Sequence, residues 1–240
     1  KDGSTTTVAS QGKITGGYNS NIGGGIYING GSFTMQGGNI TGNRTTNESI
    51  GGGGVCVNPI GNFTMHGGSI TNNEALGWGG GVYAQGNFIV TGGSITGNKS
   101  QNGGVYFDNA LTVGGTAVID NNQRTGPRPG ECNVYINAYK TITVSASTPL
   151  TTGASIGVTT AFVPESGSPV NVTGDNSADY SSYFTSDRGC YTRNSGSGSA
   201  QVVQHAVALF PTVTSISPTA GSTVGGTTVT ITVTNLIGAT

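Results

Sequence analysis

The sequence predicts an all-β protein whose main part is a right-handed parallel β-helix with three short strands in each coil. Three observations carry this prediction. Near-copies of one segment recur with a period of about 27 residues. Each copy contains three short apolar pieces with strand-like alternation and no helical period. Finally, 44 of the 240 residues are glycine and only 8% are charged, which suits narrow coils joined by turns of small residues.

Five copies of the repeat align on a leading apolar residue. The first is "GGGIYINGGSFTMQGGNITGN" from Gly23, and the weakest is "NVYINAYKTITV" from Asn133. Successive leading residues are 29, 27, 23 and 29 positions apart, and they are Ile26, Val55, Val82, Val105 and Val134. A period of this length is typical of solenoid proteins, and the chain length divided by it predicts about seven or eight coils.

Alternation within each copy predicts which side chains point into the solenoid. The leading residues form one inward wall. A second wall consists of Phe33, Phe63, Phe88, Leu111 and Ile142. A third wall consists of Ile40, Ile70, Ile95 and Ile119. One turn repeats an asparagine, which predicts a hydrogen-bonded amide ladder of Asn43, Asn73, Asn98 and Asn122.

The repeats resemble the Gly-rich right-handed β-helix repeats of large bacterial cell-surface proteins, in the pectate-lyase-like superfamily. The segments "GGGIYI", "FTMHGGSITNN" and "NVYINAYKTITV" carry the resemblance, which covers residues 14–145. It implies an extracellular or cell-surface location and a structural or adhesive role.

The period loosens after residue 145, so we expect residues 146–209 to form irregular closing coils of one domain that spans 1–209. The end of a β-helix exposes unpaired backbone and needs a cap. Polar and aromatic residues in "SADYSSYFTSDRGCYTRN" are the predicted cap, namely Asp179, Tyr180, Tyr183, Phe184, Asp187 and Arg188.

Residues 210–240 form a second segment. The stretches "SISPTAGSTVGGTTVTI" and "NLIGAT" resemble the start of an IPT/TIG domain, an immunoglobulin-like sandwich. A whole sandwich of this kind needs about 80–100 residues, so the segment is incomplete by itself. Either the parent chain continues, or these strands pair with the β-helix or with a neighbouring molecule. Pairing with a neighbour predicts head-to-tail assembly by strand addition.

Composition excludes several functions. A net charge of −1 gives no footprint for nucleic acid, and no apolar run is long enough to span a membrane. We expect no cofactor and no metal, because no phosphate-binding, EF-hand or metal-ligand spacing occurs. The sequence leaves the pairing of the three cysteines open. Cys132 and Cys190 could form a disulfide, or both could be unpaired thiols like Cys56.

Acid–base residues are sparse in the repeats. Asp108 and Asp120 could approach each other beside Arg124, but a turn role for Asp120 is the preferred interpretation. His66 is interpreted as a turn residue, and His205 stands in an alternating strand without a visible partner. The loop 121–132 concentrates Arg124, Arg128 and Glu131, and we interpret it as a tolerated insertion.

The middle residue of the first strand predicts an outward aromatic stripe, interrupted by Cys56. The stripe and one nearby turn residue are the candidate glycan-binding residues: Tyr27, Tyr83, Tyr106, Tyr135 and Trp78. Aromatic rings can stack on sugars, although a sheet-stabilising ladder under loops is the preferred interpretation. A weaker hypothesis is ice or mineral binding by regularly placed outward threonines, which Ile89 interrupts: Thr34, Thr64, Thr112 and Thr143.

The sequence therefore predicts a non-catalytic structural or adhesive module of a secreted or cell-surface protein or extracellular fibre. Its expected partners are other copies of itself, neighbouring surface-protein domains, or a glycan. The alternative is a carbohydrate-active β-helix enzyme, a polysaccharide lyase or glycosidase, or a glycan-binding module. Carboxylates clustered on one outer face would favour the enzyme.

Overall fold

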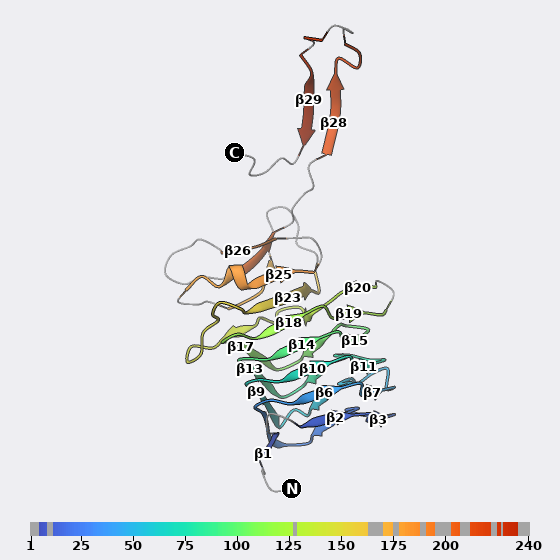
Figure 1. Cartoon of the computed structure of the whole chain (residues 1–240), viewed down its shortest axis with the longest axis vertical. Coiled ribbons are helices and arrows are strands. Elements are labelled where there is room, and N and C mark those ends of the chain that lie inside the picture. Colours follow the sequence, from blue (N-terminus) through green and yellow to red (C-terminus); the bar gives the residue numbers. More distant parts are fainter. Residues whose placement is uncertain are drawn as a thin grey trace.

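A computed structural model describes residues 5–8, 12–126, 129–162, 170–174, 178–187, 191–194, 203–206, 212–221, 225–226 and 228–234. Regular structure in these ranges is β apart from one short 3-10 turn, η1 (Ser181–Tyr183). The strands stack in parallel into a solenoid of about six coils, with the N-terminal coil at one end (Figure 1). The predicted fold class is confirmed.

Each coil contributes to parallel ladders of strands, which we number in the order in which a coil crosses them. The first ladder consists of β4 (Ile26–Ile28), β8 (Val55–Val57), β12 (Val82–Ala84), β16 (Val105–Phe107) and β21 (Val134–Ile136). The second consists of β1 (Thr5–Val8), β5 (Gly31–Met35), β9 (Gly61–Met65), β13 (Asn87–Val90), β17 (Ala110–Val113) and β22 (Thr143–Val144). The third consists of β2 (Lys13–Thr15), β6 (Asn39–Thr41), β10 (Ser69–Thr71), β14 (Ser94–Thr96), β18 (Val118–Asp120) and β23 (Ser155–Thr160).

A fourth ladder of two-residue strands was not predicted. It consists of β3 (Tyr18–Asn19), β7 (Arg44–Thr45), β11 (Glu74–Ala75), β15 (Lys99–Ser100) and β19 (Gln123–Arg124), with β20 (Gly130–Glu131) added antiparallel to β19. These strands are mostly polar, so they leave no apolar signal in the sequence. Backbone hydrogen bonds hold them, such as that from the Glu74 N–H to the Asn43 carbonyl at 2.9 Å.

The predicted walls line the core in register. Phe33, Phe63 and Phe88 pair across β5, β9 and β13, and the last two rings stack with centroids 4.9 Å apart. The leading residues and the isoleucine wall align in the same way, and Ile14 and Ile156 extend the latter at its two ends. All these side chains belong to one apolar cluster, with Ile14 and Ile26 only partly buried.

The asparagine ladder also forms as predicted. The side-chain oxygen of Asn98 accepts from both the backbone N–H and the amide nitrogen of Asn73, each at 3.0 Å. Asn43 bonds Asn73 in the same way, and Asn98 bonds Asn122. The residue before each rung has a positive φ, which explains why only glycine or asparagine stands there: Gly42, Asn72, Gly97 and Asn121.

The glycine triplets make room for this ladder. A Cβ on Gly81 would lie 2.9 Å from the side-chain nitrogen of Asn98, closer than real Cβ atoms approach. Gly54 and Gly104 stand in the same relation to Asn73 and Asn122. Repetition of glycine at this position is therefore a packing requirement.

The solenoid closes sooner than the predicted seven or eight coils. β23 crosses from the third ladder to the first, because Ile156 pairs with Ile119 of β18 while Val158 pairs with Val134 of β21. β25 (Phe184–Ser186) then adds to β23, and beyond it lies a separate antiparallel sheet of β24 (Val170–Asn171), β27 (Val203–Ala206) and β26 (Tyr191–Asn194). The count was wrong because the late sequence forms this closing structure instead of further coils.

The predicted cap residues take part in closure where they are described. Phe184 is buried in the core, with Tyr180 and Tyr183 packed against it, and Asp179 accepts a hydrogen bond from the Ser181 N–H at 2.8 Å. Arg188 lies outside the described residues.

At the C-terminal end, β28 (Thr212–Ser217) and β29 (Thr230–Thr234) form an antiparallel pair with a bulge after Val213. Among the described residues, no helix is long and apolar enough to cross a membrane.

Candidate functional site

The predicted aromatic stripe lies in register on the outer side of the first ladder. Tyr27 pairs with Cys56, Cys56 with Tyr83, Tyr83 with Tyr106, and Tyr106 with Tyr135. Neighbouring strand residues such as Val82 point into the core, so the middle residues point away from it.

Most of the stripe is nevertheless covered. Tyr83 and Tyr106 are each 3% exposed and Cys56 is 1% exposed, in a second apolar cluster that Ile22, Ile50 and Trp78 help to form. The Trp78 ring centroid lies 4.5 Å from that of Tyr106 and 6.0 Å from that of Tyr83. The five predicted site residues thus do not form one open surface, and Tyr27, at 41% exposure, and the partly buried Tyr135 are its accessible ends. Sugar binding by this face stays a prediction.

A polar row follows the first ladder and holds the phenol groups. It consists of Asn29, Asn58, Gln85, Asp108 and Asn137, each directly after a first-ladder strand. The Tyr83 hydroxyl donates to Asp108 at 2.9 Å, Asn137 donates to the Tyr106 hydroxyl at 3.3 Å, and Asn58 donates to the Tyr27 hydroxyl at 3.0 Å.

These environments keep the buried groups protonated. Burial raises the pKa of Tyr106 to about 12, with the Asp108 carboxylate adding to the shift, and it raises the pKa of Tyr83 further. Burial also raises the pKa of the Cys56 thiol to about 12. A protonated, covered thiol is a poor nucleophile, so Cys56 acts as an apolar member of the cluster.

The predicted carboxylate candidates do not meet. Asp108 bonds Tyr83 at the end of the first ladder, whereas Asp120 accepts from the Asn121 N–H at 2.8 Å at the end of a third-ladder strand. Arg124 lies over the ring of Tyr135, 5.3 Å from its centroid. Arg44 and Glu74 form an ion pair at 3.7 Å on the fourth ladder.

The two histidines separate. The His66 ring lies 2.8 Å from the Thr91 hydroxyl on the next coil. His205 is in β27, where side chains are not described. Within the described ranges, no three His, Cys, Asp or Glu side chains gather into a metal site.

The asparagine ladder extends further than the repeat predicts, to a carboxylate. Asn122 bonds Asn133, and Asn133 bonds Asp187 through its backbone N–H at 2.7 Å and its side-chain amide at 2.8 Å. Thr159 also donates to Asp187, at 2.8 Å. Burial raises the pKa of Asp187, while the hydrogen bonds from Asn133 oppose the shift. The sequence did not reveal these rungs because they fall outside the repeated turn in which glycine or asparagine precedes the rung asparagine.

Cys132 lies beside the end of the ladder. Its buried thiol is free and 3.8 Å from a guanidinium nitrogen of Arg124, and burial raises its pKa. Cys190, the partner in one of the two pairings that the sequence left open, lies outside the described residues.

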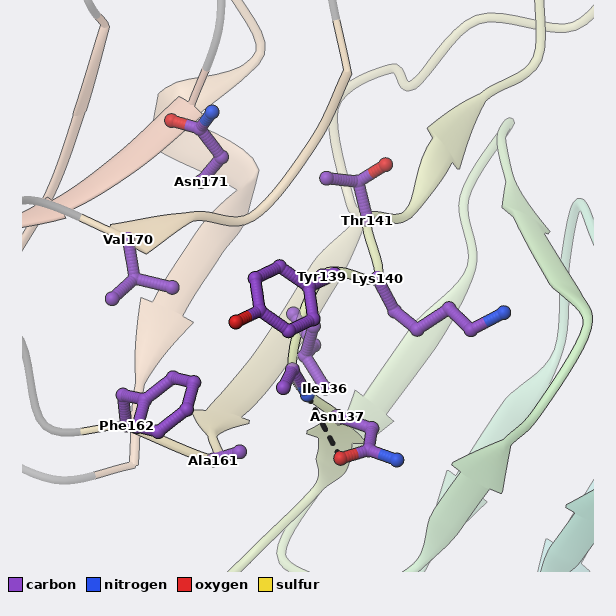
Figure 2. Close-up of a pocket in the computed structure, with 10 residues that line it drawn as sticks. Ile136, Asn137, Tyr139, Lys140, Thr141, Ala161, Phe162, Val170 and Asn171 are labelled. Atoms are coloured by element: carbon purple, nitrogen blue, oxygen red, sulfur yellow. Dashed lines mark hydrogen bonds between the residues drawn. The ribbon is translucent and has the colours of Figure 1, made fainter.

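A pocket of about 400 Å³ opens where the last regular coil meets the closing segments. Figure 2 shows its lining from three segments: residues 136–141, residues 161–162, and the β24 strand. The Tyr139 ring, fully exposed, extends over it with the hydroxyl directed toward the side of Val170 and Phe162. No repeat signal indicates this pocket, because most of its lining comes from irregular segments.

The β28–β29 pair carries the clearest likeness to known proteins. Its cross-strand pairs alternate between apolar pairs, such as Ile216 with Ile231, and Thr or Ser pairs, as in a sandwich sheet with one face inward. Residues 211–240 match the IPT/TIG domain family. This TIG segment suggests an extracellular or surface module with which the β-solenoid is consistent. No curated protein and no solved structure matches the chain, so the resemblance of the repeats to pectate-lyase-like surface proteins stays a prediction.

Proposed function

We propose that the chain is a non-catalytic structural or adhesive module of a secreted or cell-surface protein. The observation that carries the proposal is the unbroken axial stack: three apolar walls and an amide ladder run through successive coils in register. Such a stack suits a stiff spacer that holds other parts of a protein apart. The TIG segment supports an extracellular setting.

Three carboxylates in the described repeats are engaged in local structure, which supports the non-catalytic role. Asp108 is bonded to a buried phenol, Asp120 to a turn N–H, and Glu74 is paired with Arg44. Acid–base catalysis on a sugar needs such groups to converge on one substrate atom, and these three point into separate interactions.

Product analysis on polysaccharides tests the proposal against the enzyme alternative. The full chain is incubated with pectin, cellulose, xylan and chitin, and soluble reducing or unsaturated ends are measured. We expect no products above a heat-treated control. Cleavage by the native chain that Asp108→Asn abolishes would replace the structural role by an enzymatic one.

We further propose that the TIG segment mediates self-association by strand addition. Val213, Ile216, Val229 and Ile231 are all about half exposed, so the β28–β29 pair presents apolar side chains without a covering layer in the described residues. Paired with a neighbouring copy, this unit would build a head-to-tail filament.

Light scattering across a concentration series tests the assembly. The full chain is compared with a chain that ends at Leu209, which keeps the solenoid core. A mass that grows with concentration only in the full chain is the expected result. Equal masses for the two chains at every concentration would exclude assembly through this segment.

A further inference from the structure

The pocket beside β21 combines an apolar lining with a polar rim. Ile136, at 2% exposure, comes from the buried wall of the solenoid, and Ala161, Phe162 and Val170 add apolar surface. Asn137, Thr141 and Asn171 supply two amides and a hydroxyl. Lys140 is the one charged residue among those that line it. This mixture of apolar surface with a few polar groups is typical of small-molecule sites.

Tyr139 is held over the pocket by a turn that does not suit it. The Lys140 N–H donates to the Asn137 carbonyl at 3.1 Å, and the Ala138 N–H donates to the Asn137 side chain at 2.8 Å. Tyr139 stands third in this turn with φ of 63°, where glycine or asparagine is favoured. A tyrosine here costs stability and exposes its ring, so stability does not explain its presence.

A second exposed ring lies on the same pocket. Phe162, at 58% exposure, comes from the segment directly after β23, and Figure 2 shows it in the part of the pocket toward which the Tyr139 hydroxyl is directed. Two exposed aromatic side chains on one concave surface are an interaction feature.

We propose that this pocket binds one pyranose ring of a glycan, with the apolar face of the sugar against Tyr139 and Phe162. Amide and hydroxyl groups both donate and accept, as sugar hydroxyls do, and Asn137, Thr141 and Asn171 supply them. Lys140 suits neutral or anionic sugars and disfavours cationic ones. The proposal names glycans as the ligand class of the adhesive module, and in this respect it rests on the proposed function.

Two hydrogen bonds hold the Asn137 amide in place. Its oxygen accepts from the Ala138 N–H and its nitrogen donates to the Tyr106 hydroxyl, which leaves one N–H and one lone pair of the amide for a ligand. The buried aromatic cluster thus positions a residue of the pocket without contacting the sugar.

A peptide strand is a poorer occupant. The strand that borders the pocket, β24, offers an edge of only two residues, Val170 and Asn171. Strand addition depends on a longer row of backbone hydrogen bonds. Peptide binding is therefore an outcome of the test that would count against the proposal.

A glycan array screened with the full chain is the first measurement, with neutral, N-acetylated and uronate-containing oligosaccharides. The best binder is then titrated calorimetrically against the native chain, Tyr139→Gly, Phe162→Ala and the control Tyr18→Ala. Tyr18 is a 69% exposed tyrosine on the first coil, far along the solenoid. We expect roughly tenfold or weaker affinity in both pocket variants and no change in the control.

Tyr139→Gly separates binding from folding, because it relieves the turn while it removes the ring. Its unfolding midpoint should equal or exceed that of the native chain. Hydrophobic peptides are titrated in the same way. Any of three results overturns the proposal: no glycan binds, glycan binding survives both pocket substitutions, or peptides are the only ligands whose binding the pocket variants lose. Product analysis on polysaccharides is read independently, so a failed glycan pocket and a failed non-catalytic role are distinguishable.

Discussion

The rung asparagines are the residues whose chemistry the fold uses most fully. The buried amide of Asn98, for example, accepts two hydrogen bonds from the coil on one side and donates to the Ile70 carbonyl and to the next rung. Because these amides lie in a nearly water-free interior, any partner left unpaired costs its full desolvation. The repeat pattern predicted four rungs, whereas Asn133 stands at the start of the fifth copy instead of in the repeated turn, and Asp187 lies in the closing segment, where no repeat indicates a rung.

Asn98→Ala tests the ladder in its middle. The substitution leaves two donors of Asn73 without an acceptor, and we expect the free energy of unfolding to fall by about 3 kcal/mol. Asn87→Ala is the matched control, because Asn87 is an exposed amide on the same coil, and we expect a change within about 0.5 kcal/mol. Urea unfolding measures both. A similar loss of unfolding free energy in the two variants would show that the buried ladder stabilises the protein no more than an exposed amide does.

Asp187 should give the protein a pH dependence of defined sign. Its pKa is raised in the folded state, so below its ordinary value of about 3.9 both states are protonated and no penalty applies. As the pH rises from the ordinary pKa toward the raised one, the carboxyl ionises in the unfolded state but stays protonated in the folded state, so this group's contribution to stability is lost over that interval.

Asp187→Asn should therefore make stability less dependent on pH. The variant keeps an oxygen that can accept from Asn133, as the amide oxygens of the other rungs do. We expect the native chain to lose stability relative to the variant as the pH rises from about 4 toward the raised pKa in urea titrations. A difference that stays constant across this range, or that grows in favour of the native chain, contradicts the assignment.

At the scale of elements, apolar strands were predictable and polar strands were not. The pieces around Phe63 and Ile70 alternate with a period of two, so their inward faces could be assigned from the sequence. The fourth ladder has only two residues per strand. Backbone hydrogen bonds between neighbouring coils form it, so its side chains carry no apolar pattern. The aromatic stripe was located correctly, but its cover depends on where Ile50 and Trp78 fold, and alternation contains no information about that.

Trp78→Ala tests whether the cover stabilises the stripe. Removal of the ring exposes Tyr83 and Tyr106, and we expect a loss of about 2–3 kcal/mol in the free energy of unfolding. The pKa of Tyr106 should fall from about 12 toward its ordinary value, because burial is the main cause of its shift. Spectrophotometric titration of tyrosine follows this change. A native-like titration curve in a folded variant would mean that Trp78 is not the cover.

At the scale of the whole molecule, one core runs through all coils. The stacking of the coils and the core side chains were predictable from the sequence, whereas the number of coils and the closure of the solenoid were not. Identical residues pair between coils, as Ile70 does with Ile40 and Ile95, and such stacks can be recognised in the sequence as repeats. Closure depends on β23 pairing with two ladders at once, a long-range arrangement without a periodic signature. The pocket shares that origin, which is why the sequence pointed to the stripe instead.

Deletion of one whole coil tests the modular core. Removal of Gly80–Asn102 joins Gly79 to Gly103 and brings Asn73 opposite Asn122 and Val55 opposite Val105, as the present registers indicate. We expect a single cooperative transition in urea, with a smaller slope because less surface is exposed on unfolding.

The control removes Ile89–Thr112, one residue more, so that Val113 follows Phe88 and the alternation is out of step. Loss of cooperative unfolding is expected only in this control. If the in-register deletion also fails to unfold cooperatively, the coils are not interchangeable units.

The amide ladder has a consequence for how such a protein can change over generations. Because every rung offers the same donors and acceptor as the one before it, unequal recombination between two repeats joins ends that already match. Gain or loss of a coil then alters the reach of the protein in discrete steps while both closing ends stay intact. The length of the solenoid can therefore change between generations without a change in the amino acids of any coil.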